Sequence, residues 1–263
     1  INETREFLNN GKYQIDGAVF SYDDLKLHKK LGETSHHPKY KMAFKFKSES
    51  KIASLVDIEW NISRNGIYTP VGIIEPTELS GAVVTRVTLH NFGNVKKNNL
   101  KRGDMISVIR SGEVIPKFEN VEKSSSEKFS FPSKCFYCSS ELTIKDIRLL
   151  CENQNCVGKT KYIILNFIDK IGIEDLSEKR LDQLLEKGLV KGIEDLFKLS
   201  KSDFLSLEKT KDKLAEKLYN SIQSVKVTTF PVFLSSLGLS GGAINKCEKI
   251  VASGINNVEK LLN

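Results

Sequence analysis

The sequence contains no apolar run that approaches the length of a membrane-spanning helix, and no signal peptide is recognisable in it. Cysteine is scarce: five occur in 263 residues, whereas small disulfide scaffolds are dense in cysteine and much shorter. We therefore expect neither a helical membrane protein nor a disulfide scaffold. The rest of the composition, with 40% hydrophobic and 28% charged residues, is ordinary for a globular protein, and the length allows two or more small domains.

Acidic residues are in the minority. Lys and Arg number 40 against 33 Asp and Glu, which gives a net charge of +7 and a pI near 9.0. An excess of positive charge favours a polyanionic partner such as nucleic acid. The excess is small, and a lysine-rich composition can also reflect a biased genome, so charge alone does not assign the partner.

Four of the five cysteines lie in two pairs that are close in sequence. Two thiols three positions apart can be aimed at one point by a tight turn, and a second pair then completes a tetrahedral site for zinc. We predict such a site at Cys135, Cys138, Cys151 and Cys156. Four cysteine ligands leave no open position for water or substrate, so the metal would be structural. The alternatives are two disulfides or four unrelated buried thiols.

The first fifty residues predict two strands. Residues 13–20 form one, interrupted at Asp16-Gly17, where either a close backbone or ligand approach or a simple bulge would explain the glycine. Residues 39–47 form the other, and their alternation separates three packed apolar side chains from three lysines: Met42, Phe44 and Phe46 against Lys41, Lys45 and Lys47. The lysines suit phosphate oxygens, although a solvated lysine face explains them equally well.

The next stretch, residues 52–121, predicts short strands throughout. Val56, Ile58, Trp60 and Ile62 alternate, and Arg64-Asn65-Gly66 then forms a hairpin turn. Further strands are expected over residues 68–74, 82–89, 105–110 and 114–121. Five short strands suit a small barrel of the OB type, a common nucleic-acid platform, with Trp60 in its core. Residues 122–128 are polar and predict a linker.

The residues after Cys156 have helical spacing. Apolar positions mark three helical faces: Leu181, Leu184 and Leu185, ended by Gly188; Leu214, Leu218, Ile222 and Val225; and Ile244, Cys247, Ile250 and Val251, which places Cys247 in a core. Segments beginning near Ile173, Leu207 and Leu237 look like weak repeats of short helix, tight turn and helix. The third repeat has Gly238, Gly241 and Gly242, whose N–H groups suit either a DNA phosphate or a simple helix cap.

Taken in order, these parts resemble the NAD-dependent DNA ligases of bacteria over essentially the whole chain. The most specific matches are Ile15-Asp16-Gly17-Ala18-Val19, Ala43-Phe44-Lys45-Phe46, Arg64-Asn65-Gly66 with Thr69-Pro70-Val71, Thr88-Leu89-His90-Asn91, Arg102-Gly103-Asp104, Gly112-Glu113-Val114-Ile115-Pro116 and the four cysteines.

The resemblance implies adenylate transfer. In that family a lysine attacks the α-phosphate of NAD and expels nicotinamide mononucleotide, the adenylate passes to the 5′-phosphate of a nick, and the 3′-hydroxyl displaces AMP, with Mg²⁺ required. It implies catalytic roles for Asp16, Lys45 and Arg64 and adenylate contacts for Asp16, Gly17 and Lys45. It also implies contacts with nicked double-stranded DNA from Arg64, His90, Asn91, Arg102, Arg110, Gly238, Gly241 and Gly242.

The sequence departs from the family's pattern in several places. The Lys-x-Asp-Gly motif of the nucleophile and the domain that binds the nicotinamide half of NAD do not occur in it, so the chain is not expected to adenylylate itself. Gln14 and Ser21 stand where the family usually has glutamate and lysine. The first two repeats read Glu174-Asp175 and Lys209-Thr210 where the family favours glycines, and only Lys209 and Lys211 there could hold DNA by charge.

We therefore expect the C-terminal portion of a ligase, with Zn²⁺ in the chain and NAD and Mg²⁺ used by the complete enzyme. A separate polypeptide with the Lys-x-Asp-Gly motif would complete the sheet, as in a split enzyme of a bacterium or its virus, working inside the cell. Because the chain begins with Ile1, trimming of a single-chain ligase is a simpler variant. A non-enzymatic DNA-binding protein derived from a ligase is the alternative from another class.

The expected fold class is α+β and multidomain. Residues 1–51 would be the end of a nucleotidyltransferase sheet, residues 52–122 an OB-fold β-barrel, residues 130–160 a four-cysteine zinc finger and residues 161–263 a helix-hairpin-helix α domain.

Overall fold

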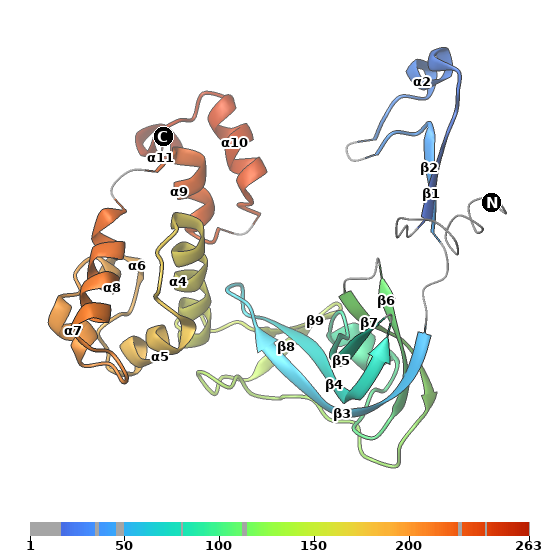
Figure 1. Cartoon of the computed structure of the whole chain (residues 1–263), viewed down its shortest axis with the longest axis horizontal. Helices are drawn as coiled ribbons and strands as arrows, with labels where there is room; N and C mark the ends of the chain where they lie inside the picture. Colours follow the sequence, from blue (N-terminus) through green and yellow to red (C-terminus); the bar gives the residue numbers. More distant parts are fainter. Residues whose placement is uncertain are drawn as a thin grey trace. The chain divides into compact units, whose positions relative to one another are not determined.

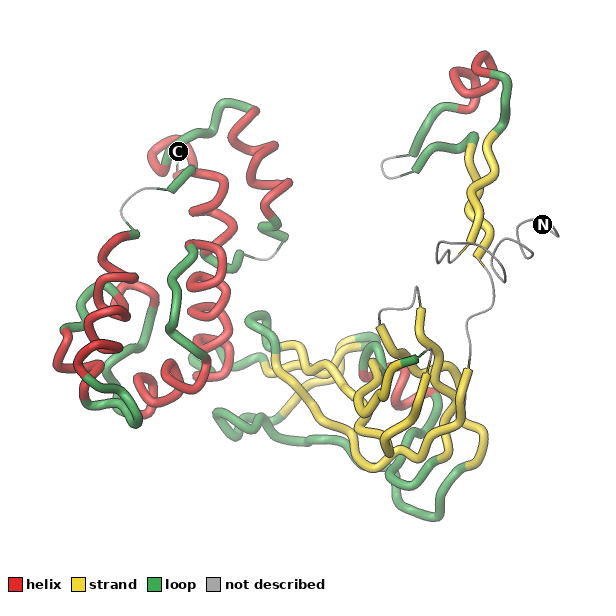
Figure 2. The backbone as a smooth tube through the Cα atoms, in the orientation of Figure 1, coloured by secondary structure: helices red, strands yellow, loops and turns green. Residues whose placement is uncertain are grey.

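The computed structural model describes residues 17–34, 37–45, 50–79, 81–111, 115–225, 228–239 and 241–262. Two compact units divide the chain, one of residues 1–59, 70–90 and 94–129 and one of residues 60–69, 91–93 and 130–263. Among the described residues, none of the helices has the length and hydropathy that crossing a membrane requires. Each unit is described in turn (Figures 1 and 2).

The first unit begins with a two-stranded antiparallel sheet, β1 (Gly17–Ser21) and β2 (Lys41–Lys45), joined through α2 (Leu25–Leu31). Both predicted strands are therefore present in the described residues. The predicted packing of one face is wrong, because Met42 is 71% and Phe44 36% exposed. Within the described residues these two strands form a ribbon by themselves, so neither face has a second layer to cover it.

A closed barrel follows in the chain. Its strands are β3 (Ser50–Ile62), β4 (Ile67–Leu79), β5 (Ala82–Thr88), β6 (Met105–Ser111) and β7 (Ile115–Lys123). They pair in the order β3-β6-β7-β5-β4, and an additional β3–β4 pairing closes the circle, which confirms the predicted five-stranded barrel in the described residues (Figure 1). Its interior is apolar, with buried Leu55, Val87, Leu89, Ile106 and Val108. Helix α3 (Phe92–Lys97) lies between β5 and β6 in the sequence.

Two details of the barrel differ from the prediction. Ala53 and Leu55 are buried near the start of β3, whereas Val56, which was expected on the core side, is 44% exposed. Odd-numbered residues are buried near the start of β3, but the even-numbered Ile62 is buried at its end. A bend or bulge within the strand therefore breaks the simple alternation. Trp60 packs against the buried Phe92, as expected for a core position.

Residues 122–128 were also predicted as a linker, and this is wrong for their first half. Strand β7 continues to Lys123. The backbone N–H of Ser125 then donates to the carboxylate of Asp104 at 2.7 Å, and its hydroxyl donates to the carbonyl of Arg102 at 2.6 Å. Asp104 is fully buried, so these contacts satisfy a buried charge and join this segment to the barrel.

The second unit contains a short hairpin and a helical bundle. The hairpin is β8 (Leu142–Lys145) with β9 (Arg148–Cys151), and β9 also pairs with the start of β4. The helices are α4 (Val157–Ile171), α5 (Glu178–Glu186), α6 (Ile193–Leu196), α7 (Lys201–Leu205), α8 (Asp212–Ser224), α9 (Phe230–Ser236), α10 (Ile244–Ala252) and α11 (Val258–Leu262). One apolar core joins α4 to α8 and includes Ile164, Leu181, Phe204 and Leu218.

Three pairs of neighbouring helices are joined by short loops of similar conformation. They are α4–α5, α7–α8 and α9–α10, and we call them hairpins 1, 2 and 3. Each connecting loop has a residue with positive φ at the equivalent place: Asp175 at 64°, Lys209 at 55° and Gly241 at 76°. The backbone conformation is thus kept even where glycine is absent. Cys247 is 2% exposed on α10, in agreement with the predicted core position.

The loop of hairpin 2 gives a stability prediction. Lys209 occupies a left-handed conformation that costs a non-glycine residue about 1–2 kcal/mol. Lys209→Gly should remove that strain and, after the added entropy of the unfolded chain, raise the free energy of unfolding by up to about 1 kcal/mol in urea denaturation. Lys213→Gly is the matched control, because Lys213 lies within α8, where glycine should destabilise the helix by about 1 kcal/mol. Equal effects of the two changes would contradict this account.

Candidate metal centre and nucleic-acid interface

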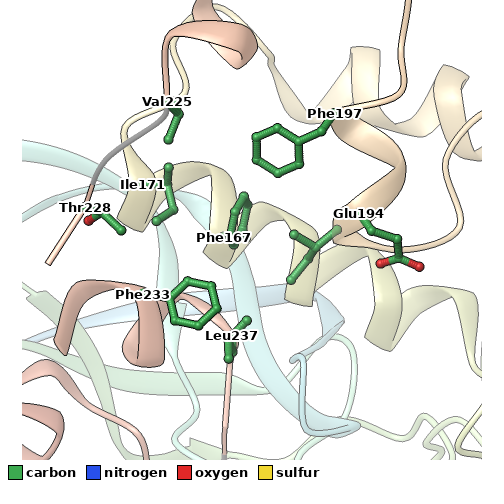
Figure 3. Close-up of a pocket in the computed structure, with 9 residues that line it drawn as sticks. Phe167, Ile171, Glu194, Phe197, Val225, Thr228, Phe233 and Leu237 are labelled. Atoms are coloured by element: carbon green, nitrogen blue, oxygen red, sulfur yellow. The ribbon is translucent and has the colours of Figure 1, made fainter. Parts of the chain in front are cut away.

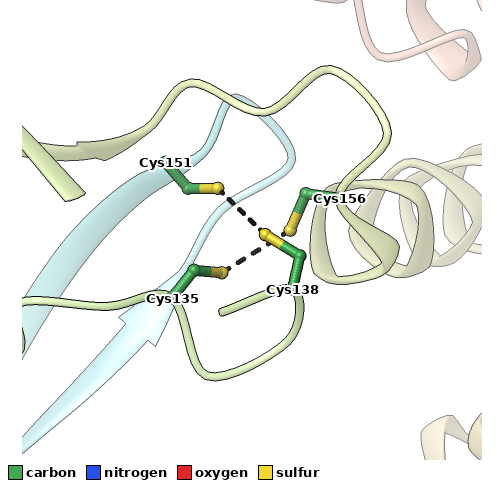
Figure 4. Close-up of side chains that lie close together, drawn as sticks. All are labelled: Cys135, Cys138, Cys151 and Cys156. Carbon is green, nitrogen blue, oxygen red and sulfur yellow. Dashed lines mark hydrogen bonds between the residues drawn. The ribbon is translucent and has the colours of Figure 1, made fainter. Parts of the chain in front are cut away.

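The four predicted cysteines come together in the second unit. Their sulfur atoms all lie within 4.8 Å of one another, with Cys135, Cys151 and Cys156 buried and Cys138 half-buried (Figure 4). The Cys135–Cys156 and Cys138–Cys151 sulfur pairs are each 3.6 Å apart. A disulfide would need about 2.05 Å, whereas zinc–sulfur bonds of about 2.3 Å give tetrahedral edges of about 3.8 Å. The donor set and its spacing fit a tetrahedral metal.

Two tight turns aim the sulfur atoms at one point. In the first, Cys135 N–H donates to the carbonyl of Ser140 at 2.8 Å, and Ser139 N–H donates to the carbonyl of Cys135 at 2.9 Å. Ser139 has a positive φ of 58°. In the second, the Asn153 side chain accepts from Asn155 N–H at 2.9 Å, and Cys156 occupies the N-cap position of α4 without a side-chain capping bond. The second pair therefore fixes where the first long helix begins.

The start of β4 braces the cluster from another side. The hydroxyl of Tyr68 donates to the sulfur of Cys135 at 3.3 Å and accepts from Phe136 N–H at 3.1 Å. Gly66, in the predicted Arg64-Asn65-Gly66 turn, has φ +77°, and a Cβ there would lie 2.4 Å from the carbonyl oxygen of Cys151. The turn glycine is thus required both by its conformation and by contact with a cysteine backbone.

The thiols differ in their readiness to ionise. Burial raises the pKa of Cys151 to about 12 and also raises the pKa of Cys156. Burial acts in the same direction on Cys138, but hydrogen bonds with Ser140 outweigh it and lower that pKa to about 6. Without a cation, at least two of the four thiols stay protonated at neutral pH, so a metal must displace protons to bind.

Arg64 belongs to the β3–β4 turn, and its side chain lies next to the loop of hairpin 3. Its side chain is half-buried, and its Nε has no hydrogen-bond partner in the described part of the chain. A Cβ on Gly238 would lie 3.1 Å from the Cδ of Arg64, so this glycine lets the arginine stem pass close to the loop. The structure therefore brings together two of the residues that sequence reasoning assigned to DNA.

The other two glycines of hairpin 3 lie further along the same loop. Gly238 and Gly241 both have positive φ, 71° and 76°. The N–H of Gly242 donates to the carbonyl of Leu239 at 2.9 Å, so this amide already has a partner. The N-terminus of α10 begins after Ala243, which provides no side-chain cap.

The DNA-contact residues predicted on the barrel are spread along its strands and loops. Arg102 pairs with Asp57 at 2.8 Å, and Arg110 in β6 is half-buried opposite Pro116 of β7. His90 has a positive φ of 66°, and its backbone N–H donates to the hydroxyl of Thr88 at 3.1 Å. Asn91 directly precedes α3 and is half-buried.

The predicted adenylate residues lie at the start of the described chain. Asp16 is outside the described residues, and the side chain of Lys45 is also not described. The backbone of Gly17 pairs with that of Lys45 across the β1–β2 ribbon. The register therefore places Lys45 directly opposite Gly17.

A hollow in the helical unit has a different character. It measures about 520 Å³ and is lined by Phe167, Ile171, Ile193, Glu194, Phe197, Val225, Thr228, Phe233 and Leu237 (Figure 3). Glu194 is the charged group among these residues. An apolar hollow with a carboxylate at its rim is unsuited to phosphate, so it does not belong to the nucleotide or DNA chemistry.

Sequence reasoning also missed the buried charge of Lys161. Lys161 on α4 is 5% exposed, and its ammonium group donates to Glu178 at 2.8 Å and Asp182 at 2.7 Å. Burial alone would lower the pKa of Lys161, but the bonds to Asp182 and Glu178 raise it. A signal was present, because Lys161 precedes Ile164 and Ile168 at helical spacing and so stands in an otherwise apolar stripe.

Two family models match this chain, in the order of the first two domains that the sequence predicts. The model described as the NAD-dependent DNA ligase adenylation domain matches residues 1–49, and that of the NAD-dependent DNA ligase OB-fold domain matches residues 52–130.

Curated relatives are similar over most of this chain. The DNA ligase of Wolinella succinogenes is 38% identical over 231 residues, 86% of this chain and 36% of the relative. DNA ligase 1 of Clostridium acetobutylicum is 36% identical over 245 residues, 91% of this chain and 36% of the relative. A DNA ligase of Clostridium botulinum is 38% identical over the same extent. The chain thus spans about a third of the length of these relatives, and it belongs to the NAD-dependent DNA ligase family.

Proposed function

We propose that this chain is the DNA-binding and catalysis-supporting part of an NAD-dependent DNA ligase that seals nicks in duplex DNA. The observation that carries the proposal is the order of the two family matches, adenylation then OB-fold, followed by a four-cysteine cluster and helical hairpins in one chain. NAD and Mg²⁺ are the cofactors of the proposed reaction.

The nucleophile of that reaction lies outside these 263 residues, because they contain no Lys-x-Asp-Gly motif. The motif would come either from a second polypeptide or from another segment of the same protein. An amine must be deprotonated when it attacks the α-phosphate, and the later transfers depend on positioning and on cations near the phosphate charge that develops.

The proposal gives this chain's residues supporting roles in those transfers. Asp16 and Gly17 would lie beside the adenylate, and Lys45 would contact its phosphate. Arg64 would close on the nick. Further DNA-backbone contacts are proposed for His90, Asn91, Arg102, Arg110, Gly238, Gly241 and Gly242. Contacts of this kind position duplex DNA without reading its sequence.

We also propose that the cysteine cluster holds Zn²⁺ and that the hairpins form a helix-hairpin-helix domain. Zinc bound by four thiolates has no open position, so it would hold the two turns and the start of α4 in place and take no part in the chemistry. The domain boundaries proposed are residues 1–51, 52–122, 130–160 and 161–263. The alternative function, a DNA-binding protein derived from a ligase without activity, keeps all of these parts except catalysis.

A substitution at Lys45 distinguishes the ligase function from the non-catalytic DNA-binding alternative. Lys45→Ala in the natively purified protein should lower nick sealing by at least about a hundredfold, because a phosphate contact in the transition state is lost, while the affinity for nicked DNA changes little. Sealing is measured with labelled nicked duplex, NAD and Mg²⁺.

Lys41 is the matched control, since it lies four residues earlier on the same face of β2 and pairs with Ser21 instead. Lys41→Ala should leave sealing nearly unchanged. Equal losses from both variants would show a general charge effect, and a loss of binding from Lys45→Ala without sealing by any variant would favour the non-catalytic alternative.

The zinc proposal predicts different effects at two buried cysteines. Cys151→Ser should lose the metal and unfold the region around the two turns, because metal-binding energy there is folding energy. Cys247→Ser, which alters an equally buried thiol outside the cluster, should keep a full complement of zinc. Metal analysis of the purified variants measures this, and zinc retained at parity in Cys151→Ser would refute the site.

Zinc affinity should also depend on pH with a defined sign. Burial keeps the Cys151 and Cys156 thiols protonated near neutrality, so binding releases protons, and affinity should rise by about tenfold or more per unit between about pH 6 and pH 8. Competition with a chromogenic chelator at several pH values measures it. An affinity independent of pH would mean that the ligands are not these thiols.

A further inference from the structure

Hairpins 1 and 2 have loops of similar conformation that differ in charge at two equivalent positions. Hairpin 1 has Asp175 and Ser177 where hairpin 2 has Lys209 and Lys211, whereas Glu174 and Glu178 are matched by Glu208 and Asp212. Asp175 and Lys209 are the two residues with matching positive φ. A DNA phosphate is attracted by the second loop and repelled by the first, so the two hairpins are not equivalent towards DNA.

The polar groups of hairpin 1 are already used inside the protein. The N–H of Glu174 donates to the hydroxyl of Ser221 on α8 at 2.9 Å, and the carboxylate of Asp175 pairs with Lys217 on α8 at 2.7 Å. Arg180 donates to the carbonyl of Asp175 at 3.1 Å and to the hydroxyl of Ser177 at 3.3 Å. The guanidinium thus lies across the loop at the N-terminus of α5, on the side of the helix that would otherwise meet an anion.

A reciprocal bond ties hairpin 2 to hairpin 1. The N–H of Glu208, which is the equivalent of Glu174, donates to the side chain of Gln183 on α5 at 2.8 Å. Each loop is therefore anchored on the second helix of the other hairpin. In hairpin 2 the two lysines that follow the anchored amide of Glu208, Lys209 and Lys211, are exposed.

The other side of hairpin 1 is bound to the cysteine cluster. Lys161 on α4 holds Glu178 and Asp182 of α5, and its ammonium group lies 5.9 Å from the ring centroid of Tyr137, which directly precedes a cysteine of the cluster. A Cβ on Gly158 would lie 2.6 Å from that ring, so Tyr137 is pressed against the first turn of α4. These contacts run without a gap from the cysteine turn through Lys161 to α5.

We propose that hairpin 1 is an internal bracket between the cysteine cluster and hairpin 2, and that the DNA backbone is held in this half of the domain by Lys209 and Lys211 of hairpin 2. This rests on the proposed DNA-binding function. It assigns the carboxylates of Asp175 and Glu178 to intramolecular pairs, and it makes hairpin 2 an interaction surface for a polyanionic duplex. Hairpin 1 fixes the position of that surface through α8.

The test exchanges the residues that precede α5 and α8, Ser177 and Lys211, which are equivalent in the two hairpins. Binding of the natively purified protein to nicked duplex is measured over a range of salt concentrations. Lys211→Ser should weaken binding and reduce the slope of log affinity against log salt by about 0.9, the value for one phosphate contact. Ser177→Lys should leave affinity and slope unchanged. A slope that rises by about 0.9 in Ser177→Lys would show that hairpin 1 faces DNA and would overturn the proposal.

A second measurement tests the bracket without DNA. Lys161→Met keeps the volume of the side chain but leaves Glu178 and Asp182 without their buried partner. Hydrogen exchange of the α5 amides should then speed up by about tenfold or more, with zinc content unchanged. Unchanged exchange in α5 would overturn the bracket. Failure of the unaltered protein to bind nicked duplex would instead refute the DNA-binding function and leave this exchange result standing.

Discussion

The meeting of four thiols at one point is the constraint on which the second unit depends. Cys135 and Cys138 fix one turn, Cys151 ends β9, and Cys156 starts α4. The β8–β9 hairpin lies between the two cysteine pairs, and Cys156 directly precedes α4, so the cluster decides where the helical bundle begins. Tyr68 and Gly66 add contacts from the β3–β4 turn to the same cysteines, and the turn that carries Arg64 is thereby positioned by the cluster as well.

Beyond the cluster, polar contacts between helices, and not apolar packing alone, fix the position of one helix relative to the next. Lys161 is the clearest case, because its charge is almost fully buried and is balanced by two carboxylates on α5. Removing one partner of such a pair is costly, so the relation between α4 and α5 is well defined. The backbone N–H groups of Glu174 and Glu208 bond reciprocally to α8 and α5. These bonds fix the position of α8 and of the lysines in the loop of hairpin 2.

The cysteine cluster, the β3–β4 turn and several helices could be predicted from the sequence, because the patterns that indicate them are local. The spacing of the cysteines, the Asn65-Gly66 turn and the apolar faces of α5, α8 and α10 each depend on a few neighbouring residues. The errors have non-local causes. Val56 is exposed because a long strand turns around a barrel, the serines near residue 125 are bound by a buried Asp104, and Lys161 is buried because carboxylates reach it from another helix. The candidate site could be predicted only as separate pieces, since the contact of Arg64 with Gly238 joins residues far apart in the chain.

The central claim is that these parts serve the sealing of nicks. The most direct measurement is to purify the protein natively, identify what accompanies it, and assay the preparation on nicked duplex with Mg²⁺, with and without NAD. The account predicts joining that requires NAD and a Lys-x-Asp-Gly motif in the preparation. A preparation that contains this motif, binds nicked duplex and never joins it would contradict the account and leave a DNA-binding protein built from the same barrel, cysteine cluster and hairpins.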